Sequence, residues 1–261
     1  MKLEAAEPRE LPTRGAGRRH LPLAALVLAA AVWASVADSG LVRHRALAGP
    51  MATLGAMAAG LADGTLAWDL LATLARMLTG VAIGAILGVP LGLVSGGARA
   101  RAIEPSLDFL RAIPPLLLFP LLLLTFGYDE RARVGAVAWA ATLVVSMHVA
   151  GGVSRASVAR RRALSAMGAG LVHRLRWLHL YELAPACLTG LRHAVGAGLI
   201  VATVTEMVVG AEHGLGSRAV AAQIAYDAPG LYAVIFATGA ASFALSRGVL
   251  AIERRLVRWR A

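Results

Sequence analysis

Long apolar runs alternate with short polar gaps along most of the chain, and six of the runs approach the length of about 20 residues that a helix needs to cross a bilayer. They are too long, and alternate too little, for the strands of a membrane barrel, and lipid leaves helices as the other way to satisfy backbone polar groups. We therefore predict an all-α polytopic membrane protein with six transmembrane helices, at residues 21–37, 70–94, 107–126, 134–151, 184–209 and 230–251.

The composition agrees with this assignment. The chain of 261 residues is 58% hydrophobic and only 16% charged, whereas soluble domains are roughly 45 to 50% apolar and about 25% charged. This balance excludes a disordered chain and argues strongly against a water-soluble enzyme.

The net charge of +11 follows the gaps between the runs. Seventeen of the 26 lysine and arginine residues lie in the amino-terminal tail, in the gaps after the second and fourth runs, and in the carboxyl-terminal tail, while five lie in the other gaps. By the positive-inside rule both termini are then cytoplasmic. Aromatic residues amount to 5%, so the basic residues indicate membrane topology rather than nucleic-acid binding.

This topology divides the chain into a cytoplasmic tail at 1–20, a first transmembrane helix at 21–37, a core at 70–251 that includes a cytoplasmic region at 155–183, and a cytoplasmic tail at 252–261. The first run also fits a cleavable signal peptide, because it follows a basic tail and ends in Ser35, Val36 and Ala37. Cleavage would leave the other five spans in the same orientation.

The second span carries glycine at every fourth position. Four residues advance a helix by about 400°, so these glycines form a stripe that drifts slowly around the helix. Such a stripe lets a second helix approach closely, and Pro90 within it is expected to bend the helix. We assign a helix-packing role to Gly80, Gly84, Gly88, Gly92 and Gly96.

Several ionisable residues lie inside the apolar runs, where a charge costs about 2.5 to 3.5 kcal/mol on insertion scales. Arg76, Arg111 and Arg192 lie near span ends, so we expect their side chains to reach the membrane interface. Other polar groups inside spans are expected to face a partner, water or a pathway. The predicted translocation-path residues are Glu206, Thr203, Thr205, Ser146 and His148.

The gap between the fourth and fifth runs contains an amphipathic pattern. Apolar residues recur there at three- and four-residue steps, while basic residues occupy the other faces. Two central glycines, Gly168 and Gly170, are expected to weaken the helix or divide it into two segments. The periodicity alone allows either a helix lying on anionic lipid or a docking element for a partner. The apolar positions are Leu164, Met167, Leu171, Leu175 and Leu178.

A set of motifs extends from about residue 70 to the carboxyl terminus. The downstream motifs are Gly168, Pro185, Gly190, Leu191, Arg192, Glu206, Gly214, Leu215 and Gly216. The upstream motifs are Leu110, Arg111, Ala112, Ile113, Pro114, Pro115, Pro120, Phe126, Gly127, Asp129 and Glu130. The downstream set resembles the cytoplasmic Glu-Ala-Ala loop and following segment of ATP-binding-cassette (ABC) importer permeases. The upstream set is similar to the nitrate, sulfonate and taurine branch of that binding-protein-dependent family.

The resemblance implies a type I ABC importer permease fold and a chain that passes a small solute, such as a sulfonate, nitrate, taurine or a similar organic anion, by alternating access. It also implies three kinds of partner: ABC ATPase subunits, an external solute-binding protein, and a second permease copy that is either identical or a close paralogue. In that family a coupling helix in the loop seats in a groove of the ATPase. The matching docking residues are Arg162, Ala163, Leu164, Met167, Gly168, Leu171 and Leu175.

The sequence departs from the family pattern in this loop. It has Arg162, Ala163 and Leu164 where glutamate, alanine and alanine are usual, and Tyr181 where a proline is usual. We therefore expect charge pairing with the ATPase to differ from that of the family.

The chain lacks the groups that a phosphate-binding loop needs. Lys2 is the only lysine, and no glycine-rich turn surrounds it. We therefore expect no catalytic residue and no directly bound cofactor, with ATP and Mg²⁺ held by the partner ATPase. The single cysteine, Cys187, excludes an internal disulfide and a cysteine-rich metal cluster, and no metal site is predicted.

Two other functions fit parts of the pattern. A secondary transporter or channel would work without an ATPase, but it normally carries several acids in mid-span, and Glu206 alone approaches this. An intramembrane hydrolase would use Ser95 as the nucleophile and His148 as the base, but no oxyanion donor accompanies them.

Overall fold

A computed structural model describes residues 21–39, 47–97, 100–155, 166–168, 170 and 180–257, and this part of the chain is entirely helical. The prediction of an all-α protein is therefore confirmed. In chain order the elements are α1 (Leu21–Asp38), α2 (Pro50–Ala62), α3 (Thr65–Ser95), α4 (Ala100–Ala112), the 3₁₀ helix η2 (Pro115–Leu118), α5 (Phe119–Phe126), α6 (Glu130–Ser154), α9 (Leu180–Val209), α10 (Leu215–Ile224) and α11 (Ala228–Leu256).

Four helices in the described residues are individually long and apolar enough to cross a membrane: α3, α6, α9 and α11. The predicted single span at 107–126 is wrong as a continuous helix, because α4 and the segment from η2 to α5 meet at an angle of 80°. Proline has no N–H and keeps the residue before it out of the helical conformation, so the helix breaks at Pro114 and Pro115. If the bent pair is one span, the count is five.

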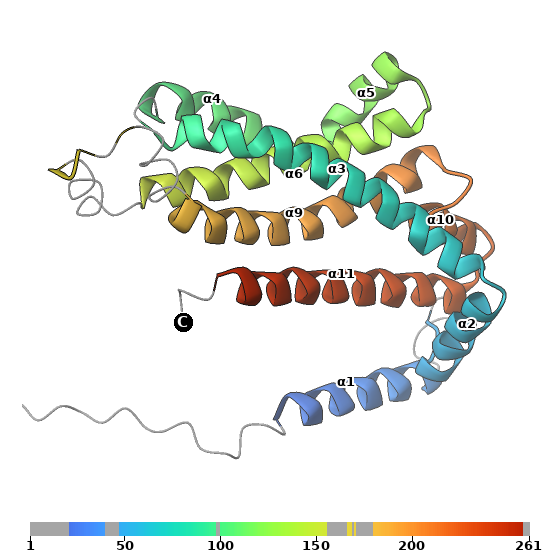
Figure 1. Cartoon of the computed structure of the whole chain (residues 1–261). Helices are drawn as coiled ribbons and strands as arrows, with labels where there is room; N and C mark the ends of the chain where they lie inside the picture. The colour runs from blue at the N-terminus through green and yellow to red at the C-terminus, as the bar shows by residue number, and fades with distance from the viewer. Residues whose placement is uncertain are drawn as a thin grey trace, which may run out of the picture.

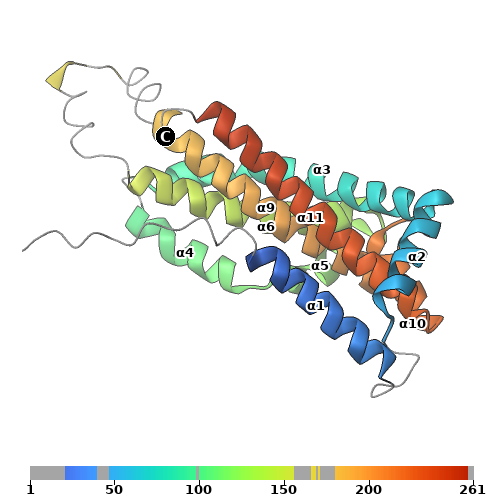
Figure 2. The same cartoon turned by 90° about the horizontal axis from the view of Figure 1, so that it is seen from below.

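The predicted count of six spans is not confirmed. The helix α1 has 18 residues, at the short end of the range for a bilayer crossing, and it is not among the four helices named above. The helix lies against α11, where the Trp33 ring stacks on Tyr232 and Phe236 at centroid distances of 5.8 and 5.4 Å. Figure 2 shows α1 alongside α11, at the edge of the bundle.

The centre of the bundle is formed by α3, α6 and α9, which pack along their lengths (Figure 1). Here α3 and α6 run in the same direction, because successive glycines of α3 lie against successive residues of α6. A Cβ atom added at Gly84 would lie 2.4 Å from the Cβ atom of Ala141, closer than real Cβ contacts. The pairs are Gly80 with Val137, Gly84 with Ala141, Gly88 with Val145, Gly92 with Val149 and Gly96 with Val153. We call this contact the α3–α6 seam.

The helices define two ends of the bundle (Figure 1). One end, which we call the α10 end, carries α2, α10 and the start of α6. The opposite end, which we call the C-terminal end, carries the end of α6, the start of α9 and the end of α11. Among the four helices long enough to cross a membrane α11 is the least covered, since only Ala233, Val234 and Ala237 are buried along its 29 residues.

A small polar cap starts α3 at the α10 end. The backbone N–H and the hydroxyl of Thr65 both donate to Oδ1 of Asp63, at 2.9 and 2.7 Å. These hydrogen bonds favour the ionised form, so the pKa of Asp63 lies below its ordinary value.

Candidate functional site

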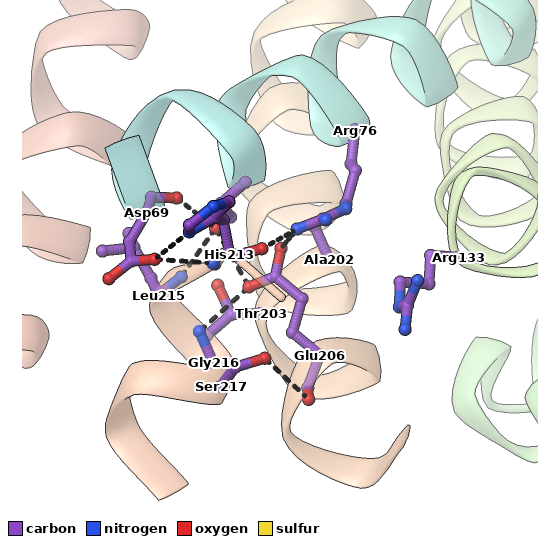
Figure 3. Close-up of polar contacts among 12 residues, drawn as sticks. Asp69, Arg76, Arg133, Ala202, Thr203, Glu206, His213, Leu215, Gly216 and Ser217 are labelled. Carbon is purple, nitrogen blue, oxygen red and sulfur yellow. Dashed lines mark hydrogen bonds and ion pairs between the residues drawn. The ribbon is translucent and has the colours of Figure 1, made fainter. Parts of the chain in front are cut away.

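The most concentrated set of buried polar contacts lies at the α10 end, around Glu206 near the end of α9. Its side chain is fully buried. Its carboxylate accepts hydrogen bonds from the hydroxyl of Thr73 at 2.9 Å, from the backbone N–H of Gly216 at 2.9 Å and from Nη1 of Arg76 at 2.7 Å. A buried charge is stable only when it is paired and hydrogen-bonded, and here α3 and α10 supply the partners (Figure 3).

Arg76 extends this ionic network from α3 to α6. Its Nε and Nη2 atoms donate to the two carboxylate oxygens of Glu130 at 2.6 and 2.9 Å, a bidentate geometry that fixes both side chains. The expectation that Arg76 reaches the membrane interface stays a prediction, and in the structure its guanidinium pairs with Glu130 and Glu206. Opposite charges on α6 and α9 lie at its level, and pairing with them replaces solvation by water.

A second arginine joins the network to the loop after α9. Arg133 of α6 donates from Nη1 to Glu130 at 3.0 Å and from Nη2 to the carbonyl oxygen of Gly210. Arg76 donates to the carbonyl oxygen of His213 in the same loop, at 2.7 Å. Both arginines thus satisfy loop carbonyls that would otherwise lack a partner.

The start of α10 is fastened through three consecutive backbone N–H groups. Gly214 donates to Oδ1 of Asp69 at 3.0 Å, Leu215 to the hydroxyl of Thr73 at 2.9 Å, and Gly216 to Glu206 as described above. The first N–H groups of a helix have no partner within the helix, and carboxylates are favourable there. Arg218 of α10 closes the contact by donating to Asp69 at 3.1 Å.

Two glycines permit this close docking. Gly214 has φ of 157°, and a Cβ atom there would lie 2.6 Å from the carboxylate of Glu206. A Cβ atom at Gly216 would lie 2.1 Å from the carbonyl oxygen of Thr203. The Gly214, Leu215, Gly216 motif therefore has a physical role, because side chains at its glycines would push α10 away from α9.

The structure does not bring the five predicted translocation-path residues together. Thr205 and Ser146 are fully buried, and their hydroxyls donate to carbonyl oxygens of their own helices, those of Ala202 and Leu143. Thr203 is half-buried and bonds to its own helix in the same way. Only Glu206 belongs to the ionic network.

His148 lies in the half of the bundle nearer the C-terminal end. Its Nδ1 atom is 2.9 Å from the carbonyl oxygen of Val144, and its ring stacks on that of His193 in α9 at 4.9 Å. The hydroxyl of Ser95 donates to Gly92 in its own helix. In the described residues no hydrogen bond joins Ser95 to His148, so the geometry gives a serine hydrolase no support.

The predicted docking residues fall mostly outside the described residues. This holds for Arg162, Ala163, Leu164, Leu171 and Leu175. Met167 and Gly168 are described, and both are exposed. Gly168 has φ of 69°, a left-handed conformation that glycine adopts without strain.

Sequence reasoning missed most of the network, although one signal was present. Asp69, Thr73 and Arg76 are spaced by four and three residues, which puts polar side chains on a single face of an otherwise apolar helix. Such a face implies polar partners on a neighbouring element. The identity of those partners, Glu206 and Glu130, depends on packing between distant parts of the chain.

Comparison with known proteins gives consistent matches. A family model described as "Binding-protein-dependent transport system inner membrane component" matches residues 80–258. A probable ABC transporter permease protein of Brucella melitensis is 31% identical over 218 residues, which cover 82% of this chain and 87% of that protein. The taurine transport system permease protein of Escherichia coli is 28% identical over 246 residues, covering 92% of this chain and 89% of that protein.

Two further matches extend this set. The bicarbonate transport system permease protein of Synechococcus elongatus is 27% identical over 252 residues, covering 91% of this chain and 89% of that protein. Among solved structures, an inward-facing conformation of the MetNI methionine ABC transporter superposes with a TM-score of 0.63 at 20% identity, covering 76% of this chain and 96% of that chain. At this identity the structural likeness concerns the fold.

Proposed function

The chain belongs to the family of binding-protein-dependent transport system inner membrane components, and on this premise we propose how it is oriented, what it assembles with and what it carries. It is a multi-pass membrane permease subunit of an ABC importer and not an enzyme, and the ATPase is a separate subunit. The resemblance to the nitrate, sulfonate and taurine branch, and the permease fold that it implied, are therefore confirmed.

In our proposal the C-terminal end faces the cytoplasm. The single observation that carries this orientation is that Ser154 at the end of α6 and Leu180 at the start of α9 both lie at the C-terminal end, as does the end of α11 (Figure 1). The connection from 155 to 179 starts and finishes at this end, and it contains six arginines. Basic loops remain in the cytoplasm. Both termini are then cytoplasmic, since α1 starts toward the same end.

The partners follow from the two ends. An external solute-binding protein docks at the α10 end, a second permease copy completes the pathway, and ATPase subunits dock at the C-terminal end. ATP and Mg²⁺ are bound by those ATPase subunits. In this assembly the docking contact is made by Arg162, Ala163, Leu164, Met167, Gly168, Leu171 and Leu175.

The cargo we propose is a small organic or inorganic anion. Support comes from the relatives whose names specify taurine, aliphatic sulfonates and bicarbonate, which all carry an oxyanion group. Alternating access requires only that nucleotide in the ATPase bind the two conformations of the permease unequally.

The predicted path residues divide in this proposal according to their exposure. Thr203 and His148 are half-buried and retain surface that a pathway can use. Glu206, Thr205 and Ser146 are fully buried, so in the conformation described they support the path without lining it.

Docking at the C-terminal end is tested by a matched pair of substitutions. Met167 and Leu256 are both exposed apolar residues at that end, with 71% and 57% of their surface accessible. Met167→Asp should weaken co-purification of the full chain with its ATPase in detergent by at least about tenfold, because a charge replaces an apolar contact group. Leu256→Asp should leave co-purification unchanged.

A stronger test of docking replaces residues 164–178 by a glycine and serine segment of equal length. Association with the ATPase should then be lost while the chain still inserts into the membrane. Unchanged association in this variant, or equal effects of the two aspartate substitutions, would refute docking through this segment.

A further inference from the structure

The arginines within the predicted spans have unequal surroundings. Arg76 pairs with Glu206 and Glu130, and Arg111 pairs with Asp108 at 2.7 Å. Arg192 of α9 and Arg247 of α11 form no ion pair with any carboxylate in the described part of the chain. Within the described residues, these two guanidinium groups therefore lie inside candidate membrane-crossing helices without an acidic partner.

Both arginines line one cavity. This cavity, of about 460 Å³, lies between α9 and α11 and is lined by Arg192, His193, Phe243, Ser246 and Arg247 among others. Its volume falls in the range of small-molecule sites, about 300 to 1,000 Å³. None of its described lining residues carries a carboxylate.

The two arginines lie well inside their helices. Arg192 is 12 residues after the start of α9 at Leu180, and Arg247 is nine residues before the end of α11 at Leu256. At 1.5 Å per residue they lie about 18 Å and about 14 Å from these helix ends. The helices α9 and α11 run in opposite directions (Figure 1), and the two arginines meet at the same cavity.

Neighbouring rings hold the cationic groups in place. The guanidinium of Arg247 lies over the ring of Phe243, with Cζ 5.4 Å from the ring centroid. His193 is backed by the ring of His148, at 4.9 Å. Ser246 adds a hydroxyl that can donate a hydrogen bond. The cavity thus offers several donors and positive charge without an acidic partner.

An intramembrane cation without a protein partner indicates a ligand or a pathway. We propose that Arg192, His193 and Arg247 form a binding site for an oxyanion group, such as a sulfonate, carboxylate or phosphate, and that the anionic cargo occupies it on its way to the cytoplasm. Guanidinium groups bind oxyanions through short charge-assisted hydrogen bonds. This inference rests on the proposed function and adds the residues that hold the cargo in the half of the pathway nearer the ATPase.

Binding of radiolabelled sulfate by the full chain tests the site. The chain is placed in nanodiscs of phosphatidylcholine, which has no net charge, and sulfate binding is measured by equilibrium dialysis. We expect one sulfate per chain, and Arg192→Gln and Arg247→Gln should each weaken binding at least tenfold. The matched control is Arg255→Gln, which removes the same charge from an exposed position of the same helix outside the cavity.

A nanodisc of phosphatidylglycerol separates the two sources of an oxyanion. If the site serves the cargo, sulfate should still bind there with an affinity within about threefold, after correction for surface charge. Displacement of sulfate by this lipid would overturn the cargo assignment, because the headgroup would then be the occupant. Sulfate binding that is absent, or that Arg255→Gln weakens as much as Arg247→Gln does, would overturn the site itself.

Co-purification with the ATPase, measured on the same variants, distinguishes failure of the anion site from failure of the proposed importer function. Arg192→Gln and Arg247→Gln should still assemble, since each arginine lies at least about 14 Å along its helix from the C-terminal end. Normal assembly without sulfate binding would refute this site and leave the importer function intact. Failure of the unmodified chain to assemble would instead count against the proposed function.

Discussion

Between α3 and α6 the backbones touch through glycine, and at the α10 end of the same helices the buried charges have opposite charges against them. Between α9 and α11 there is a cavity, and two guanidinium groups beside it have no carboxylate partner in the described residues. In the first region the helices pack without a gap and the buried charges are paired. In the second region the helices leave a cavity, and the two arginines have no acidic partner in the described residues. The comparison indicates that packing and ion pairing along α3 and α6 stabilise the fold, while the arginines beside α11 remain available to bind a ligand.

The largest effect on stability should come from replacing one arginine by glutamine in each region. Arg76→Gln removes the positive partner of the buried Glu206, so it should lower the free energy of unfolding by about 3 to 5 kcal/mol, the usual cost of leaving a buried charge unpaired. Arg192→Gln should change it by less than about 0.5 kcal/mol, as expected where no ion pair is lost.

The measurement is the shift in the thermal unfolding midpoint of the purified chain in detergent. Equal shifts of the unfolding midpoint for the two arginine variants would show that the difference in ion pairing does not affect stability. A large drop in the unfolding midpoint for Arg192→Gln alone would show that the stabilising arginine lies between α9 and α11 and not at the α10 end of α3.

A smaller effect is expected from adding a single methyl group in each region. Gly84→Ala puts a Cβ atom 2.4 Å from Ala141 and should destabilise the chain by about 1 to 3 kcal/mol through overpacking. Gly239→Ala on α11 meets no atom within 4 Å and should be neutral within about 0.5 kcal/mol. A cysteine crosslink between α3 and α6, formed more slowly in Gly84→Ala, would locate the change at the seam.

The smallest effect concerns the polar cap of α3, in a loop outside both regions. Hydrogen bonds from Thr65 hold the pKa of Asp63 below its ordinary value, so ionised Asp63 stabilises the fold above the unfolded-state pKa. That contribution is lost as pH falls through the lowered folded-state pKa. Asp63→Asn should therefore lower the unfolding midpoint slightly at neutral pH and have no effect in strong acid. A difference that grows toward acid pH would contradict this assignment.

Much of the fold was predictable because hydropathy alone determines which segments can enter a bilayer. Helices α3, α6, α9 and α11 contain the predicted spans at 70–94, 134–151, 184–209 and 230–251 and extend each by a few residues. The break at Pro114 was readable as well, since two consecutive prolines exclude a straight helix. The span at 107–126 was predicted from the length of the apolar run alone, and that length does not register the two prolines within it.

The ionic network was less predictable, because it depends on pairing across long sequence separations. Arg76 and Glu206 are 130 residues apart, and each separately resembles a charge at the end of a span. The glycine stripe indicated a close contact but carried no information on its partner, because α6 presents ordinary valine and alanine residues. The cavity beside α11 was also missed, since Arg247 lies in the last span among small residues that show no motif.

The α3–α6 seam has a mechanical consequence. Glycines recur every four residues on α3, and the side chains that cover them recur every four residues on α6. A slide of one, two or three residues would drive side chains of α3 into the backbone of α6, so the next equivalent register is a full repeat away, about 6 Å along the axis. We therefore expect α3 and α6 to move as one rigid unit during the transport cycle.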